Sequence, residues 1–210
     1  MISTIQFVLI LTIALSAAGH AATDSQVTAT STSLTCSAVG APPMRTAQPV
    51  TNVDAQAIDR FIEQTIATGK VDPKRIYIFG WSNGAYMAAL YGMWRSDRIA
   101  AIGQYAGADP WSRTPCPVQM TSERQVPIVT MRNLCDALVP CASTSARATT
   151  LTEQHWPFKL QSLDWKGAPS DAECSATCSK AKGLYEHIRW PEKAVLKDSL
   201  LAFLKQYTLP

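Results

Sequence analysis

A short apolar segment runs directly into a glycine-flanked serine, and an amphipathic segment follows at once. Residues 76–79 (IYIF) form a continuous β-prone run of the kind that is buried on both faces of a parallel sheet. Residues 80–84 (GWSNG) come next, and apolar side chains then recur at helical spacing at Met87, Leu90, Tyr91 and Trp94. The sequence therefore predicts a buried strand that turns sharply into a helix, with Ser82 in the turn.

The alternation of strand-like and helix-like segments continues through most of the chain. Further strands are predicted over residues 99–105, 126–131 and 183–188, and further helices between residues 51 and 69, over residues 142–154 and over residues 196–207. Strands that alternate with helices indicate an α/β fold with a mostly parallel sheet and flanking helices. We assign residues 48–210 to a single domain of this class.

The N-terminal residues differ from this domain in composition. Residues 1–22 contain no Asp, Glu, Lys or Arg, and residues 7–15 (FVLILTIAL) form an apolar run that precedes small residues. This pattern predicts a signal peptide cleaved near Ala21 or Ala22, and the run is shorter than the roughly 20 residues that span a bilayer. We therefore expect a secreted protein without a stable membrane anchor, followed by a Ser/Thr/Pro-rich lead over residues 23–47.

Net charge, cysteine content and the lack of cofactor motifs limit what the protein is expected to bind and where it is expected to be found. Nineteen Lys and Arg residues against sixteen Asp and Glu residues give a net charge of +3, which does not favour binding of nucleic acid. The six cysteines are expected to pair in an oxidising compartment, and the sequence does not choose among the fifteen possible pairings. A bridge between Cys135 and Cys141 would brace the loop that contains Asp136. The sequence contains no zinc, phosphate-loop or dinucleotide-binding motif, so no metal or cofactor is expected.

Ser82 is the candidate nucleophile. A serine in a tight strand-to-helix turn presents its hydroxyl at the carboxyl end of the sheet, and glycines two residues before and after it avoid collisions with the strand and helix. The backbone N–H of Asn83 then faces the place where an oxyanion would form. Because a serine hydroxyl needs a base, a histidine and an acid are expected later in the chain.

Three histidines are available as the base. His20 lies in the predicted signal peptide, so the choice is between His155 and His187. His187 is favoured because it lies at the end of a predicted strand and before the last helix. His155 follows a predicted helix, where packing at the surface is a sufficient explanation. In the favoured interpretation, His187 takes the Ser82 proton and returns it to the leaving group.

Two aspartates are candidates for the acid. Asp136 follows the predicted strand over residues 126–131 across a short turn, which is the expected place for a residue that orients the imidazole. Asp109 follows the predicted strand over residues 99–105 in a similar way and remains the alternative. Either residue is also explained as an ordinary turn aspartate.

Three tryptophans near these segments are candidates for a substrate pocket. Trp81 precedes Ser82, Trp190 follows His187, and Trp111 follows the loop of Asp109. A large, flat ring suits an acyl or aromatic group, whereas packing in the core is the alternative for each of them.

Three segments together resemble one family of hydrolases. Residues 71–84 (VDPKRIYIFGWSNG) look like the nucleophile segment of secreted polyhydroxyalkanoate depolymerases and feruloyl esterase-type α/β-hydrolases. Residues 136–140 (DALVP) are similar to their acid loop, and residues 187–191 (HIRWP) resemble their histidine loop. The resemblance covers residues 48–207. It implies a secreted carboxylic ester hydrolase with a Ser-His-Asp triad that acts on a small-molecule or polymer ester without a cofactor.

One part of the family pattern is not visible. The resemblance implies an upstream strand with an H-G-G or H-G-C oxyanion segment, and residues 23–52 contain neither. The fold is therefore expected to lack its first strands, and the second oxyanion donor is unassigned. Two alternatives follow: a non-catalytic secreted protein that keeps a truncated hydrolase scaffold, and a peptidase or acyltransferase that uses the same triad.

Overall fold

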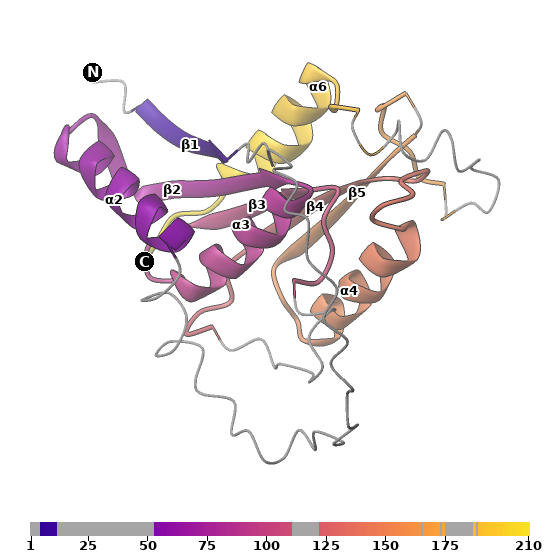
Figure 1. Cartoon of the computed structure of the whole chain (residues 1–210), viewed down its shortest axis with the longest axis horizontal. Coiled ribbons are helices and arrows are strands. Elements are labelled where there is room, and N and C mark those ends of the chain that lie inside the picture. Colours follow the sequence, from indigo (N-terminus) through magenta and orange to yellow (C-terminus); the bar gives the residue numbers. More distant parts are fainter. Residues whose placement is uncertain are drawn as a thin grey trace, which may run out of the picture.

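A computed structural model describes residues 53–110, 122–164, 166–172, 174, 187 and 189–210, together with the backbone of residues 5–11. Its centre is a parallel five-stranded sheet whose strands lie side by side in chain order (Figure 1). The strands are β1 (Ile5–Leu11), β2 (Val71–Trp81), β3 (Ala101–Tyr105), β4 (Ile128–Asn133) and β5 (Phe158–Leu163). The helices are α2 (Val53–Ala67), α3 (Asn83–Trp94), α4 (Cys141–Glu153), and a C-terminal helical segment of α6 (Lys193–Val195), a π-helical turn (Leu196–Leu201) and α7 (Ala202–Leu204).

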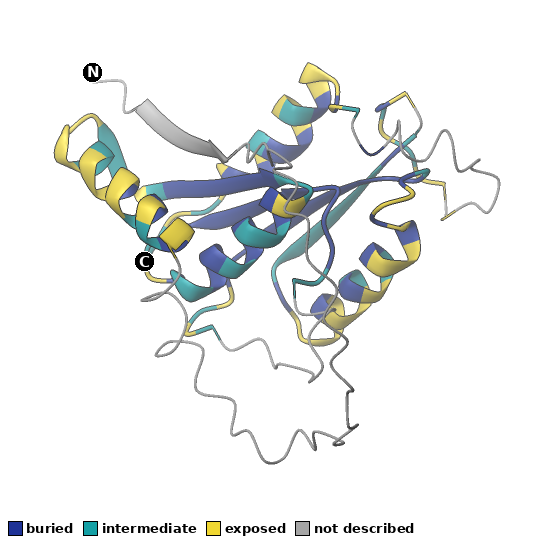
Figure 2. Ribbon diagram, in the orientation of Figure 1, coloured by how far each residue is buried: buried dark blue, intermediate teal, exposed yellow. Residues whose placement is uncertain are grey.

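Helices cover both faces of the sheet, as Figure 1 shows. Ile76 and Ile78 of β2 belong to a core that includes buried residues of α2, α3 and α4. Tyr77 and Phe79 point to the opposite face and pack with the C-terminal helical segment. The middle strands β3 and β4 are buried at every residue (Figure 2). Burial on both faces explains why residues 76–79 are apolar without alternation.

The predicted fold class, a parallel sheet with flanking helices, is confirmed. β5 is not predicted from the sequence, because its residues (FKLQSL) mix polar and apolar side chains and five of its six positions are only partly buried. The strand predicted over residues 183–188 lies outside the described residues except for His187.

β1 lies within the segment that the sequence predicts to be a signal peptide. It pairs in parallel with β2, with Leu11 opposite Gly80. One strand therefore occupies the side of the sheet on which the first strands were expected to be missing. An apolar run of this length suits both a signal segment and a buried strand. Cleavage stays a prediction, and it would turn β2 into an edge strand.

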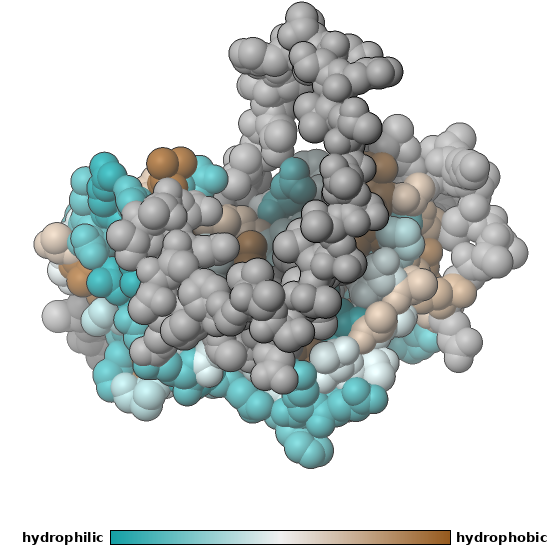
Figure 3. Space-filling model, turned by 60° about the horizontal axis from the view of Figure 1, so that its bottom comes forward, coloured by the Kyte–Doolittle hydropathy of each residue, from teal (hydrophilic) through white to brown (hydrophobic). Residues whose placement is uncertain are grey.

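The surface of the described residues is mainly hydrophilic in the view of Figure 3, with apolar residues in small patches. The large apolar side chains exposed among them are Val53, Phe61, Leu138 and Trp190. In the part of the chain that the structure describes, no helix is long and apolar enough to cross a membrane. Leu138 and Trp190 lie within three residues of the predicted acid and base in the sequence. Two of the four exposed large apolar side chains therefore belong to the acid and histidine loops.

The turn between β2 and α3 requires glycine at position 80. A Cβ atom there would lie 1.9 Å from the carbonyl oxygen of Gly84 and 2.7 Å from the backbone nitrogen of Ala85. These are backbone atoms in the first turn of α3, so they cannot move aside unless the helix moves. The absence of a side chain at this contact lets α3 begin directly beside the end of β2.

We expect Gly80→Ala to destabilise the fold by about 3 kcal/mol or more, because the clash is with backbone. The matched control is Gly69→Ala, where φ is +68° but no other atom lies within 4 Å of the added Cβ. The control should lose only about 1–2 kcal/mol from backbone strain. Urea unfolding of the two variants measures the difference, and equal losses would contradict the close contact at Gly80.

Candidate active site

Ser82 lies at the sharp turn from β2 into α3. Its backbone has φ 54° and ψ −123°, a region that residues other than glycine rarely adopt. The Ser82 N–H donates to the carbonyl of Tyr105 on β3 at 2.9 Å, and the Ser82 carbonyl accepts the N–H of Ala85 at 2.8 Å. The neighbouring strand and the first turn of α3 thus hold the strained residue at the carboxyl edge of the sheet.

The side chain of His187 joins Ser82 to Asp136. Its Nε2 lies 2.8 Å from Oγ of Ser82, and its Nδ1 lies 2.7 Å from Oδ2 of Asp136. The side chains of His187 and Asp136 are only 5% and 1% exposed. This geometry suits transfer of the serine proton to the imidazole while the carboxylate orients the ring. The structure brings together the three residues that the sequence analysis predicted as nucleophile, base and acid.

Backbone hydrogen bonds fix the carboxylate of Asp136. Its Oδ1 accepts the N–H groups of Leu138 at 2.8 Å and Val139 at 2.9 Å, which leaves Oδ2 for His187. A carboxylate can be buried when its oxygens have such partners. The residues of the loop after β4 therefore hold the acid in a defined orientation.

Asn133, the last residue of β4, supports this loop. Its Oδ1 accepts the N–H of Cys135 at 2.9 Å, and its Nδ2 donates to the carbonyl of Asp164 after β5 at 2.8 Å. This supporting role of Asn133 is not among the predictions from the sequence. The available signal was an asparagine at a strand end, where its side chain commonly bonds the backbone two residues later.

A disulfide lies beside the acid loop. Cys141, the first residue of α4, is bonded to Cys174, which excludes the bridge between Cys135 and Cys141 that the sequence left as one possibility. Cys135 takes part in another disulfide. Pairing follows distance in the folded chain, and the Cα atoms of Cys141 and Cys174 lie 5.5 Å apart across 33 residues of sequence. The bond ties the start of α4 to the segment that leads to His187.

The alternative base and acid lie in different surroundings from His187 and Asp136. His155 is exposed in the turn after α4, where its φ is 53°. Asp109 lies closer to the candidate site, because it lines the same cavity as Ser82, but its Oδ1 accepts a hydrogen bond from Nη1 of Arg147 at 3.1 Å. The geometry therefore favours Asp136 as the partner of His187.

A cavity of about 420 Å³ opens at Ser82. Its lining combines polar and apolar groups and includes Ser82, Asn83, Tyr86, Asp109, Pro110, Leu138, Val139 and His187. Asn83 lines the same cavity as Ser82, and its role as an oxyanion donor stays a prediction. Among the described residues, no group of three or more His, Cys, Asp or Glu side chains is placed to hold a metal ion.

Trp81 and Trp190 are not among the described residues that line this cavity. The indole N–H of Trp81 donates to the backbone carbonyl of His187 at 3.0 Å. The ring of Trp190 packs edge-on against Trp81, with ring centroids 6.0 Å apart. Trp81 therefore contacts the histidine loop, and Trp190 is the residue of that loop whose ring packs on Trp81, which differs from the predicted substrate-pocket role. Trp111 lies outside the described residues.

A buried cation lies behind the cavity wall. The side chain of Arg147 on α4 is 3% exposed, and it meets the half-exposed carboxylate of Asp109. Burial lowers the pKa of Arg147 to about 10, and the nearby charge of Asp109 opposes this decrease. Arg147 is therefore protonated at neutral pH. Its ion pair with Asp109 makes this wall of the cavity polar.

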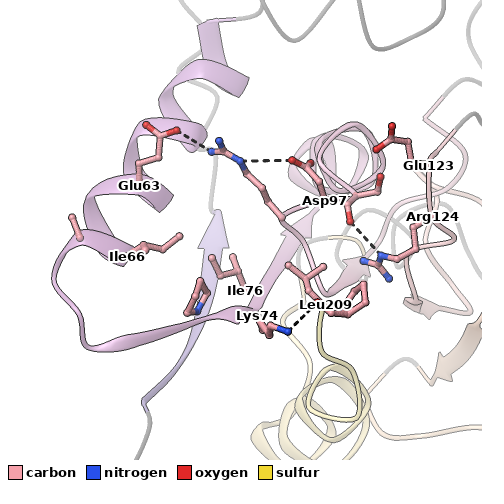
Figure 4. Close-up of a pocket in the computed structure, with 13 residues that line it drawn as sticks. Glu63, Ile66, Lys74, Ile76, Asp97, Glu123, Arg124 and Leu209 are labelled. Atoms are coloured by element: carbon pink, nitrogen blue, oxygen red, sulfur yellow. Dashed lines mark hydrogen bonds and ion pairs between the residues drawn. The ribbon is translucent and has the colours of Figure 1, made fainter.

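A larger cavity, of about 690 Å³, lies at the opposite end of β2 from Ser82. Most of its charged side chains face one another or the backbone (Figure 4). Arg98 pairs with Glu63 at 2.9 Å, Nζ of Lys74 donates to the carbonyl of Pro210 at 3.0 Å, and Arg124 donates to backbone carbonyls. Its described lining contains no histidine to activate a nucleophile, so we assign the chemistry to the smaller cavity.

Solved structures with a similar fold include several esterases. A thermostable esterase aligns with a TM-score of 0.50 and 16% identity over 74% of this chain and 37% of its own. Esterase PE8 has a TM-score of 0.48 and 18% identity, covering 73% of this chain and 60% of its own. SOBER1 of Arabidopsis thaliana has a TM-score of 0.46 and 16% identity, covering 73% and 62%. The chain spans less than two thirds of each of these proteins, and the likeness concerns the fold.

The sequence also matches a family model. The model of the phospholipase/carboxylesterase family matches residues 40–171, which is more than half of the chain and includes Ser82 and Asp136. No individual curated protein matches the sequence. The predicted resemblance to an α/β-hydrolase esterase is confirmed at the level of this family. The chain belongs to the phospholipase/carboxylesterase family.

Proposed function

We propose that this protein is a serine carboxylic ester hydrolase in which Ser82 is the nucleophile, His187 the general base and Asp136 the acid that orients the imidazole. The observation that carries this proposal is the continuous contact from Oγ of Ser82 through both ring nitrogens of His187 to the buried carboxylate. Membership of the phospholipase/carboxylesterase family supports ester chemistry. The strained backbone of Ser82 supports its role as nucleophile.

The reaction begins when Oγ of Ser82 attacks the ester carbonyl and Nε2 of His187 takes the hydroxyl proton. The bond to the alcohol oxygen of the tetrahedral intermediate then breaks, and His187 gives its proton to that leaving oxygen. Water attacks the resulting acyl-enzyme with His187 again as base, which releases the carboxylic acid and restores Ser82. The backbone N–H of Asn83 donates to the oxyanion in both steps, and we assign no second donor among the described residues.

The proposed substrate is a carboxylic ester of a small molecule or of a polymer. Leu138, which is 54% exposed, and Val139 supply apolar surface at the cavity and suit contact with an acyl chain or aromatic ring. The resemblance of residues 71–84 and 136–140 to depolymerases and feruloyl esterases supports polyhydroxyalkanoate and feruloyl esters as the first substrates to test.

We expect a fluorophosphonate probe to label the folded protein on Ser82. Ser82→Ala should abolish both labelling and hydrolysis of p-nitrophenyl esters, because no nucleophile remains beside His187. Ser170→Ala, a serine that does not line the cavity, serves as the control and should be labelled normally. Folded wild-type protein that neither reacts with the probe nor hydrolyses any ester would support the non-catalytic alternative.

The assignment of the acid predicts different effects for two aspartate variants. Asp136→Asn should keep the fold but lower kcat by about 10⁴-fold, because the imidazole loses the partner that selects its tautomer. Asp109→Asn alters the pair with Arg147 and should have a much smaller effect on kcat. Steady-state kinetics on one p-nitrophenyl ester compares them, and a larger loss in Asp109→Asn would show that the acid is misassigned.

Export of the protein is part of the same proposal. The uncharged apolar N-terminal segment supports it, and so does the disulfide between Cys141 and Cys174, because disulfides persist in oxidising compartments. Expressed with its own N-terminus in a secreting host, the protein should be recovered outside the cytoplasm with a mature N-terminus just after Ala21 or Ala22. N-terminal sequencing checks this. Recovery of an intact N-terminus in the cytoplasm would instead indicate that β1 is retained in the sheet.

A further inference from the structure

The side chain next to the proposed nucleophile binds the main chain of the proposed base. Nε1 of Trp81 donates to the carbonyl oxygen of His187 at 3.0 Å, and the two rings lie with centroids 6.0 Å apart. Trp81 is the last residue of β2 and is bonded directly to Ser82 in the chain. One side chain therefore links the backbone of the nucleophile turn to the backbone that carries the imidazole.

A second hydrogen bond reaches the same loop from the neighbouring strand. The hydroxyl of Tyr105, at the end of β3, donates to the carbonyl oxygen of Arg189 at 2.5 Å. Tyr105 also lies opposite Trp81 in the β2–β3 register, and its carbonyl accepts the N–H of Ser82. Trp81 and Tyr105, which are paired at the carboxyl ends of adjacent strands, thus bind two carbonyls of the histidine loop that are only two residues apart in the sequence.

Aromatic packing adds to these two hydrogen bonds between the strand ends and the histidine loop. The ring of Trp190, in the same loop, lies edge-on to Phe79, Trp81 and Tyr105, with centroid distances of 5.9, 6.0 and 6.1 Å. Edge-to-face packing at these distances is favourable beyond simple burial. Trp190 is 40% exposed, so one side of its ring packs on the other three rings and the rest faces solvent.

We infer that Trp81 and Tyr105 are positioning residues that hold His187 at the correct place between Ser82 and Asp136. Each side chain acts through its hydrogen bond to the backbone of the histidine loop, and the Trp81 ring also lies beside the imidazole ring. This inference rests on the proposed serine hydrolase function of the site. It assigns to Trp81 a role in catalysis that is distinct from contact with substrate.

The physical reason is the tolerance of the proton-transfer geometry. The imidazole must meet Oγ of Ser82 on one side and Oδ2 of Asp136 on the other, at 2.8 Å and 2.7 Å. The strand end holds Ser82 and the β4 loop holds Asp136, so a shift of the third backbone segment lengthens at least one of the two contacts. Misplacement of a reacting group by about 1 Å can cost about 100-fold in rate.

The test compares each positioning residue with a matched side chain elsewhere. Trp81→Phe removes the indole donor and keeps an aromatic ring. Its control is Trp156→Phe, because Nε1 of Trp156 also donates to a backbone carbonyl, that of Val126, in the core away from the cavity. Tyr105→Phe is matched by Tyr77→Phe, because the Tyr77 hydroxyl donates to the carbonyl of Tyr207.

We expect Trp81→Phe and Tyr105→Phe each to lower kcat on a p-nitrophenyl ester by about 10-fold to 100-fold with little change in KM. The control variants should lose similar stability to urea but keep kcat within about twofold of the wild type. The double variant Trp81→Phe/Tyr105→Phe should lose less than the product of the single losses, because both hydrogen bonds hold the same loop.

A proton NMR spectrum gives a readout that does not depend on turnover. The proton on Nδ1 of His187, hydrogen-bonded to Asp136, should give a resolved downfield signal that shifts or broadens in Trp81→Phe and stays in place in Trp156→Phe. Equal effects in Trp81→Phe and its control, on kcat or on this signal, would overturn the inference. Wild-type protein that is inert to esters and fluorophosphonate would contradict the proposed function instead, and the NMR comparison would still decide the role of Trp81.

Discussion

The close approach of two backbone segments at Gly80 and Gly84 is the constraint on which the site depends. With no side chain at position 80, α3 can begin beside the end of β2, and Ser82 is held in a strained conformation between them. The Ser82 N–H donates to the carbonyl of Tyr105, and the Ser82 carbonyl accepts the N–H of Ala85; both hydrogen bonds stabilise that conformation. The buried sheet and the first turn of the helix therefore hold the strained residue in place.

Parallel strand order then determines which loops can meet the serine. The carboxyl ends of β2, β3 and β4 lie at one edge of the sheet, so the loop after β4 brings Asp136 to the same edge as Ser82. The histidine loop is not part of the sheet in the described residues. Its backbone is instead attached to the ends of β2 and β3 by side-chain donors and aromatic rings. Local backbone geometry positions the nucleophile, whereas long-range contacts position the base.

The sequence was sufficient to predict the α/β class and the residues that meet at the site, because glycine spacing and strand-end positions are local signals. It did not reveal β5, whose mixed polarity reflects partial burial, or the partner of Cys141, which is 33 residues away. Trp81 and Trp190 were assigned to a substrate pocket because large rings beside a nucleophile suit that role. Only the folded chain shows that Trp81 binds the histidine loop and packs on Trp190 within it, since those contacts span more than one hundred residues.

Two carboxylates lie near the serine, and their partners separate their roles. Asp136 is buried, accepts two backbone N–H groups on one oxygen and directs the other at His187. Asp109 is 41% exposed at the cavity wall and pairs with the buried guanidinium of Arg147. Burial of Arg147 without a partner for its charge would be costly, and the ion pair with Asp109 offsets part of that cost. Different environments thus let one carboxylate orient the imidazole while the other keeps the wall polar.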